Sequence, residues 1–155
     1  MLTQLDRLVD EVVALHSKLV LLVGRPGCGK TKLLGQLAES RTAKVMNVGA
    51  ALGKRLAALP QRQRALQANV AMRELADEYA SGDLLLLDNI ELLFDQSLKL
   101  DPLDLLKRHA HARRVVAVWP GGLRDGRLSY AEIGHPEYQD YGLDGVVPFE
   151  IETAR

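Results

Sequence analysis

A glycine-rich loop between an apolar run and a periodic segment most constrains how this chain folds. Residues 19–23, LVLLV, are all Leu or Val, which is typical of a strand buried on both faces. The loop that follows, GRPGCGKT at 24–31, fits the G-x-x-x-x-G-K-[ST] pattern of the P-loop, or Walker A motif. Apolar residues at 33, 34, 37 and 38 then recur at helical spacing. This order of strand, loop and helix predicts a P-loop nucleotide-binding fold.

The residue types in this loop suit phosphate binding. Glycines allow positive φ, which turns backbone N–H groups toward phosphate oxygens, and Pro26 stiffens the loop. The N-terminus of the following helix adds a partial positive charge at the same point. We expect Lys30 to contact the β- and γ-phosphates and the Thr31 hydroxyl to bind Mg²⁺. The full set of expected nucleotide contacts is Gly24, Arg25, Pro26, Gly27, Cys28, Gly29, Lys30, Thr31 and Lys32.

A second apolar run supplies the other half of a nucleotide site. Four leucines at 84–87 end in Asp88, as in a Walker B strand, which predicts Asp88 as a Mg²⁺ ligand beside Thr31. Asn89 follows, where ATPases of the AAA+ class usually carry a glutamate that polarises the attacking water, and a neutral amide is no base. Glu91 is the nearest carboxylate and our predicted catalytic partner of Lys30, unless it is simply solvated. Because the usual glutamate is missing, we expect hydrolysis that is slow or depends on a partner.

Two later features depart from the AAA+ pattern or match it loosely. Trp119 ends a predicted strand at 115–119, where AAA+ proteins place a polar sensor residue, and we interpret it as core or interface. Arg124 and Arg127 follow on a turn-rich segment, from which arginine fingers reach a neighbouring subunit in this class. Solvated surface arginines are the alternative.

The charged residues and histidines give little support to nucleic-acid binding or to a zinc site. Twenty basic and twenty acidic residues cancel, and only 5% of residues are aromatic, so direct DNA contact is possible but unsupported. The local basic clusters are interpreted as wet helix faces or helix ends. The four histidines lack the spacing of zinc ligands. The basic clusters consist of Arg62, Arg64, Arg108, His109, His111, Arg113 and Arg114. The other two histidines are His16 and His135.

The remaining patterns predict an α/β protein with a mainly parallel five-stranded sheet between helices, an AAA+-like core. Residues 1–155 are expected to form one domain, with residues 1–16 as an amphipathic helix packed on it, near where a nucleotide base would lie. Since the chain stops after the last predicted strand, we expect no helical lid and weak, base-tolerant binding. The other predicted elements are a strand at 43–48, helices at 50–59, 61–80 and 101–112, a loop or hairpin at 121–133 and a strand at 146–151.

The cellular setting is predicted from what the sequence lacks. One cysteine rules out an internal disulfide and fits a reducing cytosol. No apolar stretch approaches the ~18 residues of a membrane span, and the first residues lack a signal-peptide pattern. We therefore expect a cytoplasmic protein that does not enter a membrane.

Together with the P-loop, three stretches resemble a known family. They are LLLLDNIELLFD at 84–95, SLKLDPL at 97–103 and GHPEY at 134–138. They resemble BrxF, the small P-loop ATPases of type 3 BREX bacteriophage-defence systems, over the chain from about residue 17 onward. The resemblance implies a bacterial protein that acts with other BREX components, among them a DNA methyltransferase and a larger ATPase. The segment 134–141 is interpreted as a contact surface or an ordered surface loop.

Three functions are compatible with these motifs. The leading one is Mg²⁺-dependent ATP binding with slow or partner-stimulated hydrolysis in a defence complex, with homo-oligomers that form when triphosphate is bound. The second is a non-hydrolysing, ATP-dependent assembly switch, which Asn89 and Trp119 favour. The third is a nucleotide or small-molecule kinase, since G-x-P-G-x-G-K-T loops also occur there. No residue predicts ATP over GTP, because the P-loop contacts only phosphates.

Overall fold

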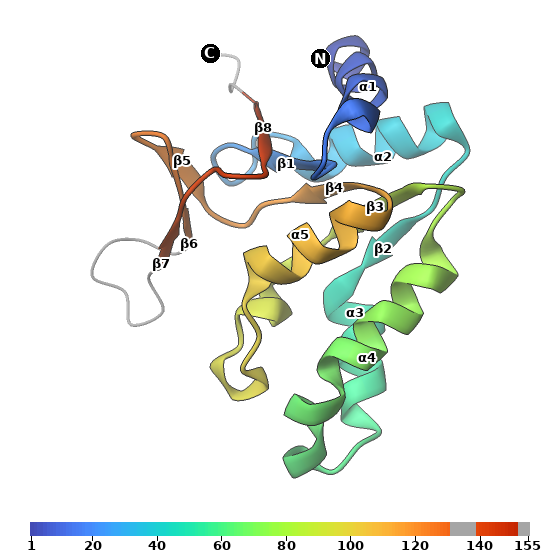
Figure 1. Ribbon diagram of the computed structural model, residues 1–155, viewed down its shortest axis with the longest axis vertical. Coiled ribbons are helices and arrows are strands. Elements are labelled where there is room, and N and C mark those ends of the chain that lie inside the picture. Colours follow the sequence, from blue (N-terminus) through green and yellow to red (C-terminus); the bar gives the residue numbers. More distant parts are fainter. Residues whose placement is uncertain (131–138, 152–155) are drawn as a thin grey trace.

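The main sheet of this computed structural model, which describes residues 1–130 and 139–151, has five parallel strands in the order β2-β3-β4-β1-β8 (Figure 1). All four ladders between neighbours are parallel. The predicted α/β architecture with a five-stranded parallel sheet is therefore confirmed. The strands are β1 (Leu19–Val23), β2 (Val45–Asn47), β3 (Leu84–Asp88), β4 (Arg114–Val118) and β8 (Val147–Glu150).

Helices connect these strands close to the predicted positions. Asn47 and Asp101 start two of them by accepting hydrogen bonds from the backbone N–H groups of Ala50 and Asp104, at 3.0 and 3.1 Å. The α-helices are α1 (Leu2–Glu11), α2 (Lys30–Arg41), α3 (Val48–Ala57), α4 (Gln61–Tyr79) and α5 (Pro102–Ala112). Short 3₁₀ helices are η1 (Val12–Ala14), η2 (Ile90–Phe94) and η3 (Gln96–Leu98).

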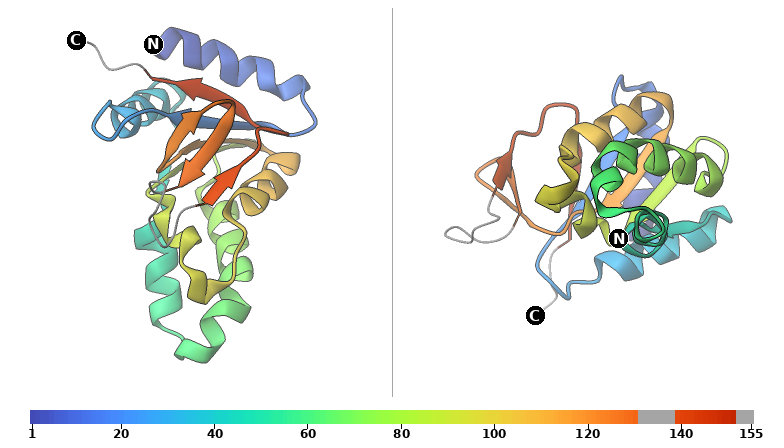
Figure 2. Two further views of the ribbon diagram at one scale, coloured as in Figure 1. Left: turned by 90° about the vertical axis from the view of Figure 1, so that its left-hand side faces the viewer. Right: turned by 90° about the horizontal axis from the view of Figure 1, so that it is seen from below.

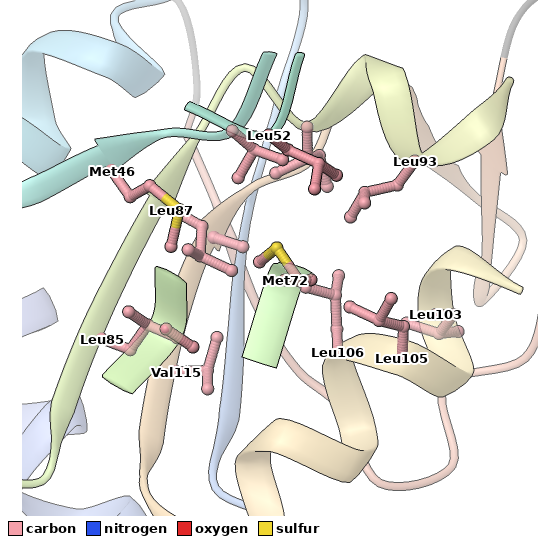
Figure 3. Packing of buried hydrophobic residues seen from close by; sticks show 14 of the residues in the cluster. Met46, Leu52, Met72, Leu85, Leu87, Leu93, Leu103, Leu105, Leu106 and Val115 are labelled. Carbon is pink, nitrogen blue, oxygen red and sulfur yellow. The ribbon is translucent and has the colours of Figure 1, made fainter. Parts of the chain in front are cut away.

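The sheet separates two hydrophobic clusters because its strands alternate between faces. In β1, Leu19, Leu21 and Val23 belong to the cluster under α3, α4 and α5, while Val20 and Leu22 belong to the cluster under α1 and α2. The same alternation holds in β3 and β4, so every residue from 84 to 87 and from 115 to 118 is buried. Figure 3 shows the first cluster, where Met46, Leu87 and Met72 fill the space between sheet and helices.

A second, smaller sheet lies beside the first and was only partly predicted (Figure 2). Strands β5 (Gly122–Arg124) and β6 (Arg127–Tyr130) form the expected hairpin, and β7 (Gln139–Tyr141) adds to it, all antiparallel. Asp125 and Gly126 both have positive φ, 52° and 73°, as a two-residue hairpin turn of type I′ requires. Strand β7 was missed because three residues carry too short an alternation to detect.

Two sequence predictions about buried faces are wrong in part. In α4, the helical repeat of Leu66, Val70, Leu75 and Tyr79 predicts one buried stripe. Leu66 is 77% exposed and Val70 is exposed as well, because the helix buries Leu75 together with Met72 and three alanines. The expected helix at 1–16 ends at Glu11 and continues as η1, which leaves Val13 and Leu15 exposed. Within the described residues, no helix is long and apolar enough to cross a membrane.

Candidate functional site

The loops after β1, β3 and β4 meet at one edge of the main sheet. Because β4 lies between β1 and β3, the P-loop and Asp88 follow strands that are separated by a single strand. The ammonium of Lys30 donates to the carbonyl oxygens of Gly24 and Trp119, at 3.0 and 2.9 Å. Ligands of open α/β sheets bind at this edge, where the strands have their carboxyl ends.

The P-loop has the backbone that the sequence predicted. Gly27 and Gly29 have φ of +79° and +100°, which a residue with a side chain rarely adopts. At Gly24, an added Cβ would lie 2.6 Å from the sulfur of Cys28 and 2.8 Å from the carbonyl oxygen of Ile151. Only glycine therefore fits where the loop leaves β1. Helix α2 begins directly at Lys30, so its first N–H groups lie at the loop.

Thr31 and Asp88 form a pair of oxygen donors. The Thr31 hydroxyl donates to Oδ1 of Asp88 over 3.2 Å, across 57 positions of sequence. A hydroxyl and a carboxylate are ligands that Mg²⁺ accepts, usually together with phosphate oxygens and water. The two side chains are thus close enough to share one such ion. Elsewhere in the described residues, no group of three or more His, Cys, Asp or Glu side chains could hold a metal.

The surroundings of the Lys30 ammonium favour the binding of an anion. Burial lowers the pKa of its ammonium from the ordinary value of 10.5, and the negative charges of Glu91 and Asp88 offset part of this effect. Among the described residues, its hydrogen-bond acceptors are two carbonyl oxygens, and a partly desolvated cation gains further from an ionic partner. Phosphate oxygens are such partners.

The position after Asp88 is held by backbone and amide contacts. Asn89 has a φ of +53°, and its backbone N–H donates to Oδ1 of Asp88 over 2.8 Å. Its side-chain amide donates to Oδ1 of Asn47 over 2.9 Å, while its carbonyl accepts from the N–H of Gly49 over 3.0 Å. Asn89 is therefore tied to the end of β2. Nothing in the sequence pattern singled out Asn47, which lies beside Asp88 only because β2 pairs with β3.

Glu91 lies in the first turn of η2 and lines the same depression as the other site residues. This depression measures about 630 Å³ and joins Lys30, Thr31, Asp88 and Glu91. Tyr130 also lines it, although it comes from β6 of the small sheet and was not predicted. Asn47, Asn89, Pro26, Val118 and Pro120 complete the lining.

A second depression of about 810 Å³ adjoins the other flank of the P-loop. Cys28, Gly29, Lys32 and Leu33 line it from the loop and α2, and Met1 and Leu2 line it from α1. It contains more apolar wall than the first and none of the carboxylates at Asp88 or Glu91. The start of α1 therefore lies beside the P-loop.

Trp119 is core, as predicted, and the structure ties it to the site. Its side chain is fully buried, and its indole N–H donates to the carbonyl oxygen of Ser129 over 2.9 Å. Arg127 pairs with Asp140 of β7 over 3.2 Å, and Arg124 is exposed on the hairpin. Neither arginine lines the two depressions described above.

Most arginines of the basic clusters form hydrogen bonds or ion pairs within the chain. Arg114 makes two bonds to the carboxylate of Asp83, at 2.7 and 3.0 Å, and these hold the pKa of Asp83 below its usual range. Arg113 donates to Asp77 over 2.7 Å, and Arg108 pairs with Asp104 over 3.0 Å. Arg64 donates to the carbonyl oxygen of Leu59, and Arg62 is exposed on the first turn of α4. All three arginines of the 108–114 cluster are thus paired with aspartates. The GHPEY stretch at 134–138 lies outside the described residues.

Comparison with known proteins agrees with this geometry. The model of the ATPase family associated with various cellular activities (AAA) matches residues 20–117. Among solved structures, 15 chains match, and one is PCH-2 of C. elegans, with a TM-score of 0.53 and 16% identity. That match covers 99% of this chain and 42% of the PCH-2 chain, and at this identity it shows a common fold. No curated protein matches the sequence.

Proposed function

Because the chain belongs to the AAA family of ATPases, we propose that it binds ATP together with Mg²⁺ and hydrolyses it slowly. The observation that carries this proposal is the convergence of Lys30, Thr31 and Asp88 at one sheet edge. The Thr31 hydroxyl lies 3.2 Å from Asp88, and the partly buried Lys30 ammonium donates to two carbonyl oxygens. These residue types at these positions match what a nucleoside triphosphate and its metal require.

Each residue of the site has a distinct role in this proposal. The loop N–H groups and Lys30 hold the phosphates, and Thr31 and Asp88 hold Mg²⁺, which neutralises phosphate charge when it is bound. Glu91 accepts a proton from the attacking water, directly or through a second water. The neutral amide of Asn89 cannot accept this proton. In this proposal it holds the loop after β3 to the end of β2 through its hydrogen bonds.

The nucleoside occupies the second depression in this proposal. The phosphates at Lys30 place the remainder of the nucleotide along the loop, toward Cys28, Lys32 and Leu33. Met1 and the start of α1 at Leu2 line the far wall, and Gln36, Glu39 and Ser40 of α2 add polar groups to it. In this proposal the apolar side chains of the wall pack against the base.

Measurements on the purified chain test the proposal. We expect ATP to bind with Mg²⁺ and phosphate to be released slowly. Lys30→Ala should weaken binding by about 10- to 100-fold and slow the release. Calorimetry reports binding and a coupled assay reports phosphate. An ATP affinity that is unchanged in Lys30→Ala would place the nucleotide elsewhere and contradict the proposal.

The second candidate is a switch that binds ATP without hydrolysing it. The specific observation in its favour is the Asn89–Asn47 bond, since an amide held by another amide stands where AAA+ enzymes usually have their base. Tight ATP binding without phosphate release would select this function. Phosphate on an added nucleoside monophosphate instead would select a kinase.

We further propose that the protein works in the bacterial cytoplasm as a BrxF-like subunit of a BREX defence complex. The stretches at 84–95 and 97–103 support this proposal. It would form one domain over residues 1–155 and oligomerise when triphosphate is bound, with Arg124 available to a neighbouring site. Loss of protection against phage in a Lys30→Ala strain, with protein level unchanged, is the expected result. Full protection in that strain would contradict a role for ATP in defence.

A further inference from the structure

Trp119 connects the P-loop to the small sheet through two different atoms. Its carbonyl oxygen accepts a hydrogen bond from the Lys30 ammonium at 2.9 Å. Its indole N–H donates to the carbonyl oxygen of Ser129 in β6, also at 2.9 Å. Its backbone N–H donates to the carbonyl oxygen of Leu22 in β1, so its backbone is also bonded to the main sheet. One residue therefore bridges the phosphate-binding lysine and a separate sheet.

An aromatic cluster extends this connection to the loop after Asp88. Phe94, the last residue of η2, stacks on Tyr130 of β6 with ring centroids 3.9 Å apart and an angle of 14°. Phe94 also meets Trp119 edge to face at 5.4 Å, and Tyr141 of β7 meets Trp119 at 5.6 Å. Burial raises the pKa of Tyr141 to about 12, so its hydroxyl stays neutral inside the cluster. The helix that carries Glu91 is thereby packed against the small sheet.

The segment between Trp119 and β5 has little freedom to absorb a movement. An added Cβ at Gly121 would lie 1.5 Å from the carbonyl oxygen of Ser129, which shows how closely the two backbones approach. The oxygen of Ser129 is the same atom that accepts the indole N–H. A movement of Trp119 is therefore expected to shift β6, because the short segment between them cannot absorb it.

From these contacts we propose that Trp119 is a positioning residue that couples phosphate binding at Lys30 to the small sheet β5–β6–β7. The proposal rests on the proposed nucleotide function. When phosphate oxygens take the Lys30 ammonium, the carbonyl of Trp119 loses its donor and turns, and the indole carries this change to Ser129. By reciprocity, a partner that shifts the small sheet changes the affinity for the triphosphate.

Hydrogen exchange with and without a non-hydrolysable ATP analogue and Mg²⁺ tests the coupling. In the wild type we expect slower exchange in residues 24–34 and a change of about 5-fold or more in residues 122–130. Trp119→Phe keeps the carbonyl that Lys30 contacts but removes the indole donor. We expect this variant to keep the P-loop response and to lose the response of 122–130.

Arg127→Gln is the matched control, because it weakens the same small sheet by removing the bond to Asp140 but leaves Trp119 untouched. It should keep the response of 122–130. Trp119 is also the only tryptophan of the chain, so its wild-type emission should change with the ATP analogue and not with adenosine. This second measurement keeps the proposal testable if Trp119→Phe does not fold.

The outcomes separate the coupling from the nucleotide function. P-loop protection without any change at 122–130 or in Trp119 emission would overturn the coupling alone. A response of 122–130 that persists in Trp119→Phe would also overturn it. If the analogue protects no P-loop residue, nucleotide binding itself fails and the coupling fails with it.

Discussion

The loop after β1 and the segment after β3 lie at the same sheet edge but differ in how completely they match a nucleotide hydrolase. The first has its glycines, lysine and threonine in place, with Lys30 held by two carbonyl oxygens and Thr31 by one carboxylate oxygen, contacts that a ligand can replace. The second has Asp88 in place, but Asn89 is bonded to Asn47 and Gly49, and Glu91 lies in a short 3₁₀ helix.

For the proposed function, this difference predicts that ATP binding and ATP hydrolysis can be separated by mutation. Phosphate binding needs donors and positive charge, which the first loop supplies from its own residues. Water activation needs a base at a defined distance, and the proposed base, Glu91, lies two residues beyond the position where AAA+ enzymes usually carry it. Changes in one segment should therefore leave the function of the other largely intact.

The largest effect is expected from Glu91→Gln. If Glu91 is the base, turnover falls by about 10²- to 10⁴-fold, because general base catalysis contributes that much, while ATP affinity stays unchanged. Single-turnover phosphate release measures the rate, and calorimetry measures the affinity. Glu78→Gln, an exposed change on α4, is the matched control and should have no effect. Unchanged turnover in Glu91→Gln would assign the base to another group.

The next effect is the loss of affinity in Lys30→Ala. Charge-assisted hydrogen bonds from one ammonium contribute about 1.5–3 kcal/mol, so we expect ATP to bind about 10- to 100-fold more weakly. Lys32→Ala changes a neighbouring lysine that lines the second depression rather than the first, and should cost less. Equal losses in both variants would show that charge in general, rather than the position of Lys30, holds the phosphates.

A smaller effect, of opposite sign, is expected from Asn89→Glu. This change places a carboxylate where AAA+ enzymes usually have one, and turnover should rise by about 10-fold, at the low end of what a general base contributes. The gain is limited because residue 89 keeps a positive φ and its contact with Gly49. Reduced turnover, with the variant folded, would mean that the Asn89–Asn47 bond supports the site rather than restrains it.

The smallest effect is the dependence of ATP affinity on alkaline pH. The pKa of Lys30 is lowered by burial, so the ammonium that binds phosphate is present at neutral pH and is lost as pH rises through this lowered value. Affinity should stay constant near pH 7 and weaken before the ordinary value of 10.5 is reached. Measurements of ATP affinity at increasing pH test this effect. Constant affinity up to that value would contradict the effect of burial.

The sequence was most informative where local pattern decides structure. The P-loop, the buried leucines before Asp88 and the Asp101–Pro102 helix start were predictable, since each needs particular residue types at fixed spacing. Asn47 and Tyr130 could not be predicted as site residues. They reach the site through strand pairing and through a second sheet, which depend on contacts distant in sequence.

Helix α4 shows a different limit of sequence analysis. Leu66 and Val70 fit a helical stripe as well as Met72 and Leu75 do, but only the latter face the core. Periodicity identifies a helix without fixing which stripe is buried, because the small side chains of Ala68, Ala71 and Ala76 also pack well.

The strand order has a consequence for how the protein is made. Strand β1 emerges from the ribosome early, but both of its neighbours, β4 and β8, come from the last third of the described chain. Such distant pairing is slow, because a long stretch of chain must close before any contact rewards it. The strand that leads into the P-loop therefore gains its first neighbour only when β4 has been synthesised, and its second only with β8. A nascent chain that stalls before β4 would carry the complete motif on an unpaired strand.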